Sequence, residues 1–122
     1  MVDQVISDLL NAKAYLLLHG WHQGNYVPEG NMPWKGQPAC MTAAVMLATH
    51  PNAGTGWPWD SERRKRFNHA MRNLCVGTAP LMVESFNDSP QCIFEDVLRA
   101  FDKAIEHRRT FLKFIDEGKR GQ

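Results

Sequence analysis

One segment of the chain constrains the fold more than any other, because it is apolar on nearly every face. The segment ACMTAAVMLATH, residues 39–50, contains no charged residue before His50. Pro38 precedes it, and proline is favoured in the first turn of a helix. A helix without a polar face must be surrounded by other elements. We therefore predict a helix over residues 38–50 at the centre of an all-α fold, and expect it to be the most buried element.

Two amphipathic segments on either side of this helix could surround it. Apolar residues recur at three- and four-residue steps over residues 2–17, which predicts a helix that ends at Gly20. A further helix is expected over residues 62–75, where Asp60 or Ser61 can act as the N-cap. Both segments carry one apolar stripe, as helices at the outside of a bundle do.

The last part of the chain predicts a short element and then a long helix. Residues 77–86 are expected to form a short helix or turn. The long helix could begin with Ser89 as N-cap and Pro90 at its first position, or with Asp88 and Gln91 as a capping box. Its expected apolar stripe comprises Ile93, Phe94, Val97, Leu98, Phe101, Ile105, Leu112 and Ile115.

Two long segments rich in proline and glycine connect these elements, over residues 22–38 and 51–60. Loops of more than about a dozen residues are uncommon in compact domains and are often functional. We expect tryptophans to fasten both loops to the core: Trp21, Trp34, Trp57 and Trp59. The sequence thus predicts a compact single-domain bundle of four to five helices over residues 1–118, with a frayed tail over residues 119–122.

Charge and cysteine content restrict the environment and the partners. The net charge of +1 provides no global attraction to nucleic acid or to a membrane surface. No apolar run approaches the ~20 residues that would cross a bilayer, and the N-terminal residues do not resemble a secretion signal. Three cysteines at wide spacing do not suggest a disulfide framework. We expect a protein of the cytoplasm, or of the host cytoplasm if a phage encodes it, without membrane association.

Three motifs, in order, resemble those of a known family. GWHQG is followed by CMTAA at the start of the apolar helix, and then by FNDSP before EDVLRAFDKAI. This order resembles a family of small uncharacterised bacterial and bacteriophage proteins, over roughly residues 6–106. Phe86, Ala43, Gln91 and Cys92 depart from the family pattern. The resemblance implies the architecture and a bacterial or phage origin, but it implies no activity.

The two most distinctive motifs provide the candidate binding residues. Gln23, Asn87 and Asp88 can donate and accept hydrogen bonds between the first loop and the FNDSP turn. Tyr26 and Trp34 combine apolar area with a polar tip, which is favoured at recognition surfaces. We predict that the segment from Gln23 to Trp34 packs against the turn at residues 86–89, and that this face binds a partner.

Cys40 is the candidate for catalysis, and also for metal binding. In the first turn of a helix its thiolate would be stabilised by the helix dipole, and His22 or His19 could act as a base. The alternative is a buried structural cysteine. A zinc site could use His19 and His22 with Cys40, His50 or Cys92, but a second pair of closely spaced ligands is missing, so we predict neither a metal nor another cofactor.

The basic run Arg63, Arg64, Lys65 and Arg66 is the candidate for nucleic-acid binding. Four successive residues spread over all faces of a helix, so a solvated helix end is the better interpretation of the run. The leading hypothesis from the sequence is therefore an accessory protein that binds a protein partner through its loop face. A cysteine-dependent enzyme centred on Cys40 is the first alternative, and a nucleic-acid-binding protein is the second.

Overall fold

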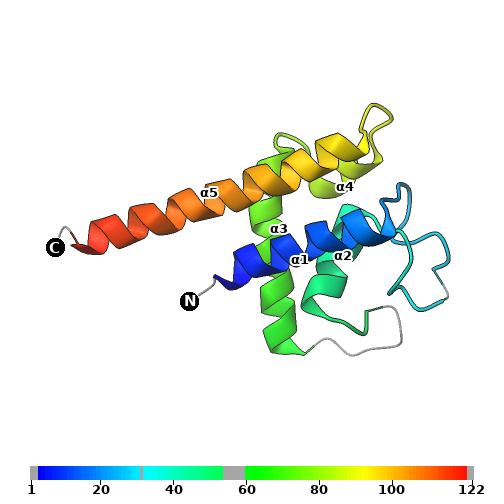
Figure 1. Ribbon diagram of the computed structural model, residues 1–122, viewed down its shortest axis with the longest axis horizontal. Coiled ribbons are helices and arrows are strands. Elements are labelled where there is room, and N and C mark those ends of the chain that lie inside the picture. The colour runs from blue at the N-terminus through cyan, green and yellow to red at the C-terminus, as the bar shows by residue number, and fades with distance from the viewer. Residues whose placement is uncertain (1–2, 31, 54–59, 121–122) are drawn as a thin grey trace.

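The computed structural model describes residues 3–30, 32–53 and 60–120, and its regular structure is helical (Figure 1). The helices are α1 (Gln4–His19), α2 (Met41–Thr49), α3 (Ser61–Thr78), α4 (Val83–Asp88) and α5 (Phe94–Arg120). The described residues include no strand; Trp21 and Ala39 form an isolated parallel bridge. The predicted all-α fold is confirmed.

Helix α2 lies in the centre of the bundle, as its composition predicts. Its buried residues are Met41, Thr42, Ala43, Ala44, Val45, Leu47 and Thr49. It packs against α1, α3 and α4, while α5 crosses α3 and α1 on the other side (Figure 1). An apolar helix is stable at this position because its neighbours remove most of its surface from water.

Helix α2 begins later than the sequence predicts. Pro38 and Ala39 lie outside it, because the backbone of Ala39 is paired with the chain that leaves α1. The Ala39 N–H donates to the Gly20 carbonyl at 3.1 Å, and the His22 N–H donates to the Ala39 carbonyl at 3.0 Å. Cys40 is therefore the N-cap of α2 and does not lie in its first turn.

Helix α1 ends at Gly20, as the sequence predicts. Gly20 has φ of 100°, and its N–H donates to the Leu16 carbonyl at 2.9 Å.

The buried face of α1 contains one carboxylate, that of Asp8, which is 0% exposed. Arg66 of α3 donates to Asp8 at 2.7 Å, and Gln4 donates to it at 2.9 Å. Ion pairing thus allows a charged residue to be buried between α1 and α3.

Helix α5 is the longest element, and its C-terminal part extends beyond the bundle (Figure 1). Val97, Phe101 and Ile105 of the predicted stripe are buried, whereas Ile93 and Ile115 are exposed. Phe94 and Leu112 are partly buried against the core, so the stripe contacts the core from Phe94 to Leu112. The helix includes residues 119 and 120 of the predicted tail, and residues 121–122 lie outside the described part of the chain.

Both predictions for the start of the last helix are wrong. Asp88 ends α4, Ser89 is its C-cap, and residues 89–93 form a turn before α5 begins at Phe94. The side chains that would cap a helix at this point have other partners, since the Asp88 carboxylate accepts from Gly24 of the first loop and the Ser89 hydroxyl donates to Gln91 Oε1. Asp96 accepts from the N–H of Ile93 at 3.1 Å and stabilises the actual start.

Of the tryptophans expected to anchor the loops, Trp57 and Trp59 lie outside the described residues. Trp21 stacks on Phe94 of α5, with ring centroids 6.2 Å apart and an interplanar angle of 8°. Trp34 packs against the core. Among the helices that the structure describes, none combines the length and the low polarity needed to cross a membrane.

Candidate functional site

The first loop, the start of α2 and the end of α4 are joined by one buried side chain, Asn87. Its Oδ1 accepts from Trp21 Nε1 at 2.8 Å and from the backbone N–H of Met41 at 2.9 Å. Its Nδ2 donates to the His22 carbonyl at 3.1 Å and to Asp88 Oδ1 at 2.9 Å. Asn87 is 2% exposed, and these four bonds use both amide protons and both lone pairs.

Three further hydrogen bonds connect the same segments. Gln23 Nε2 donates to the carbonyls of Asn87 and Ser89, each at 3.0 Å. The backbone N–H of Gly24 donates to Asp88 Oδ1 at 2.9 Å. The polar contact that the sequence predicts between Gln23 and the FNDSP turn is therefore present.

The far part of the loop is fastened to α1 by Tyr15. The Tyr15 hydroxyl shares its one proton between the carbonyls of Gln37 and Trp34, at 2.7 and 3.0 Å, and accepts from the N–H of Gly36 at 3.0 Å. The Trp34 ring lies beside that of Tyr26, with centroids 5.2 Å apart. Trp34 thus supports Tyr26 from behind.

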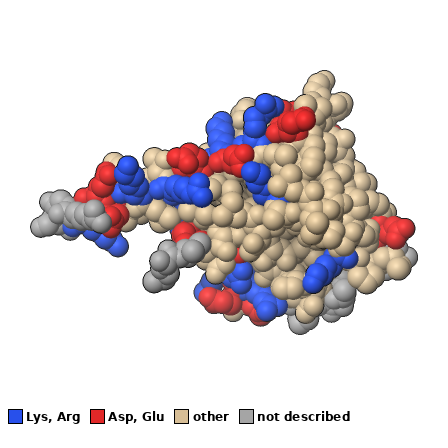
Figure 2. All heavy atoms as spheres, viewed as in Figure 1, with Lys and Arg blue, Asp and Glu red and all other residues tan. Residues whose placement is uncertain are grey.

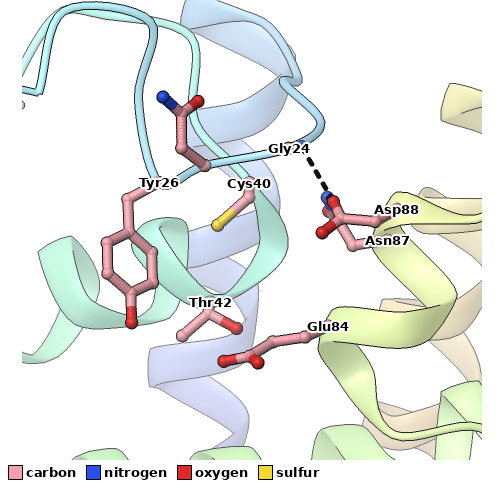
Figure 3. A pocket seen from close by; sticks show the side chains of 8 residues that line it. Gly24, Tyr26, Cys40, Thr42, Glu84, Asn87 and Asp88 are labelled. Atoms are coloured by element: carbon pink, nitrogen blue, oxygen red, sulfur yellow. Dashed lines mark hydrogen bonds between the residues drawn. The ribbon is translucent and has the colours of Figure 1, made fainter.

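A pocket of about 250 Å³ opens between the loop, the start of α2 and α4 (Figure 3). It is lined by Gly24, Asn25, Tyr26, Cys40, Thr42, Glu84, Asn87 and Asp88. Ligand sites are commonly concave and combine apolar walls with a few polar groups. Of the residues predicted from the sequence, Tyr26, Cys40, Asn87 and Asp88 line this pocket, whereas Gln23 frames it and Trp34 lies behind Tyr26.

The Cys40 thiol faces the pocket but is not activated by its surroundings. Its Sγ accepts from the N–H of Ala43 at 3.3 Å, and the residue is 7% exposed. Burial raises the pKa of the Cys40 thiol, and hydrogen bonds from the backbone of Ala43 and Thr42 oppose this rise without cancelling it. The proposed stabilisation of a thiolate by the helix dipole is therefore outweighed by desolvation.

Neither histidine considered as a base lines the pocket. The His19 ring packs on Tyr15, with centroids 4.5 Å apart. The His22 ring is hydrogen-bonded to Asn25 Oδ1. Within the described ranges, no group of three or more His, Cys, Asp and Glu side chains is arranged to hold a metal ion.

Two carboxylates give the pocket its charge. Glu84 and Asp88 lie one turn apart on α4, and no Lys, Arg or His side chain is among the described lining residues. Figure 3 shows the Glu84 carboxylate and the Thr42 hydroxyl turned toward one another. Glu84 and Thr42 are not among the site residues predicted from the sequence. The i, i+4 spacing from Glu84 to Asp88, and a hydroxyl in an otherwise apolar helix, are the signals that could have found them.

The basic run on α3 is partly engaged in structural ion pairs. Arg66 is paired with the buried Asp8, and Arg63 lies 3.7 Å from Asp60. Arg64 and Lys65 are exposed. On the face drawn in Figure 2, basic and acidic side chains alternate along the extended end of α5, so this face has no extended basic surface. The run does not form the aligned set of cations that phosphate binding favours.

The fold and the pocket define a small all-α protein with an acidic pocket between its first long loop and its fourth helix. The chain belongs to a family of unknown function (DUF6197), whose sequence profile matches residues 1–107. The predicted membership of an uncharacterised family is thereby confirmed, and the match includes every residue that lines the pocket. No curated protein and no solved structure shows significant similarity to the chain.

Proposed function

We propose that this protein is a small bacterial or phage accessory protein that binds a protein partner through the face around the pocket. The observation that carries the proposal is the preorganised pocket, whose walls are joined by the buried Asn87. Because the hydrogen bonds of Asn87 already hold the pocket walls together, less conformational entropy is lost on binding. Tyr26, which lines the pocket, is 42% exposed, so it can contribute apolar contact area to a partner.

Origin and location are part of the same proposal. The motifs resemble those of bacterial and bacteriophage proteins, which supports a bacterial or phage origin. Cys40, Cys75 and Cys92 are free thiols, which supports a location in a reducing cytoplasm. The raised pKa of Cys40 favours binding over thiol catalysis.

The proposal is tested by affinity capture with two charge-reversed variants. Glu84→Arg changes the pocket, and Glu62→Arg changes an exposed acidic residue in the first turn of α3 that does not line it. A partner of the pocket should be captured by the wild type and by Glu62→Arg, but not by Glu84→Arg. If a folded Glu84→Arg variant captures the same proteins as the wild type, the pocket face is not the binding surface.

A further inference from the structure

The charge of the pocket restricts the chemistry of its ligand. Glu84 and Asp88 contribute carboxylates, and no described lining residue contributes a positive charge. Asp88 Oδ1 already accepts from Gly24 and Asn87, whereas no other described group bonds to the Glu84 carboxylate. Unpaired carboxylate oxygens at a partly enclosed site attract cationic groups.

A second and independent feature is the hydroxyl of Thr42. Thr42 is 5% exposed, and its hydroxyl has no hydrogen-bond partner within the described part of the chain. It lines the pocket and is turned toward Glu84 (Figure 3). Because this hydroxyl borders the pocket and is not used within the described part of the chain, a ligand that donates a hydrogen bond to it would be favoured.

The remaining walls suit an alkyl chain. The ring of Tyr26 lies on one side, and the Cys40 sulfur points toward that side (Figure 3). A neutral thiol behaves as a small hydrophobic group, and an aromatic ring packs well against methylene groups. The pocket therefore has an acidic end with a free hydroxyl and a less polar end.

We propose that the ligand of this pocket is a primary alkylammonium group, namely a lysine side chain of the partner. The inference rests on the proposed function and names the group that the pocket recognises. An ammonium group has three donors, and the Glu84 carboxylate and the Thr42 hydroxyl, which are turned toward one another, offer acceptors for them (Figure 3). A quaternary ammonium has none, and a calcium ion takes six to eight oxygen ligands.

The test is an NMR titration of the full-length protein with four capped tripeptides. Their central residue is lysine, Nε-acetyl-lysine, norleucine or arginine. We expect saturable shifts of the amide signals of Gly24, Thr42 and Glu84 with the lysine peptide alone. Equal shifts with the acetyl-lysine or norleucine peptide would overturn the ammonium assignment, and stronger binding of the arginine peptide would replace it with a guanidinium.

A matched pair of substitutions distinguishes binding at the pocket from nonspecific electrostatic attraction between the peptide and the protein. Glu84→Gln removes a charge in the pocket and should weaken binding of the lysine peptide about tenfold, as expected for loss of one charge-assisted hydrogen bond. Glu62→Gln removes a similar charge elsewhere and should leave binding unchanged. Equal weakening by both substitutions would mean that the peptide senses only net charge, and would refute the inference.

One further titration, with 1,4-diaminobutane, distinguishes failure of this inference from failure of the proposed function. If the diamine binds at the pocket and the capture experiment yields no partner, the pocket recognises an alkylammonium group, but its ligand is not a lysine side chain of a protein partner and the proposed function is refuted. If capture depends on Glu84 but no ammonium probe shifts the pocket signals, the proposed function stands and this inference is refuted.

Discussion

Replacing Asn87 with alanine should weaken the whole connection between the first loop, α2 and α4. Asn87→Ala leaves the N–H groups of Trp21 and Met41 without an acceptor, and the His22 carbonyl without a donor. Each unsatisfied buried group costs about 1–3 kcal/mol. Because the adjacent pocket can admit water to these groups, the low end applies, and we expect a loss of about 3 kcal/mol in the free energy of unfolding.

A loss of this size should leave the protein folded at 25 °C, because domains are typically stable by about 5–15 kcal/mol. We expect the midpoint of thermal unfolding to fall by about 10 °C. Urea unfolding, followed by tryptophan fluorescence and by circular dichroism, measures the change in free energy.

Two further variants serve as controls for this prediction. Asn68→Ala, at an exposed position of α3, should change the free energy of unfolding by less than about 0.5 kcal/mol. Asn87→Asp retains the acceptors but loses both donors and faces Asp88, so it should also destabilise the protein. If Asn87→Ala is as stable as Asn68→Ala, the hydrogen bonds of Asn87 do not hold the site together.

Three other predictions follow from packing, ion pairing and burial. A Cβ on Gly77 would lie 1.9 Å from a backbone oxygen of α5. Gly77→Ala should therefore lower the free energy of unfolding by about 2 kcal/mol, as measured by thermal unfolding. Gly118→Ala, with no described atom within 4 Å of the new Cβ, should be neutral or slightly stabilising. Arg66→Ala leaves the buried carboxylate of Asp8 without its ion-pair partner and should lower the free energy of unfolding, measured with urea, by about 3 kcal/mol or more. Arg64→Ala should leave this free energy almost unchanged. Cys40 should react slowly with a bulky aromatic disulfide at pH 7 and faster as the pH rises, because burial raises its pKa; fast labelling at pH 7 would contradict its burial.

Local features of the sequence were sufficient for the helices and for several of their ends. The apolar run at residues 39–50 predicted a central helix, because a helix without a polar face is stable only when surrounded. Gly20 ends α1 with a positive φ, which only glycine adopts without strain. Periodicity and backbone preference act over a few residues, so a single sequence reveals them.

The errors at helix starts arose where a tertiary contact competed with a local preference. Ser89 and Pro90 are favourable residues for a helix start, yet Asp88 and the Ser89 carbonyl bind the first loop instead. Ala39 is compatible with a helix, but its backbone is paired with the chain after Gly20. In each case the competing partner lies more than 15 residues away, so local spacing could not reveal it.

The candidate site shows the same division between sequence and tertiary structure. The sequence alone determined that Gln23, Tyr26, Asn87 and Asp88 carry suitable chemistry, and the expected contact of Gln23 with the turn was correct. The tertiary structure decided that Asn87 is the buried centre, and that Glu84 faces the pocket. Burial and pairing depend on which distant segments pack together, and many arrangements of five helices satisfy the same sequence patterns. Only the packed structure selects one of them, and with it the groups that are left free to bind a ligand.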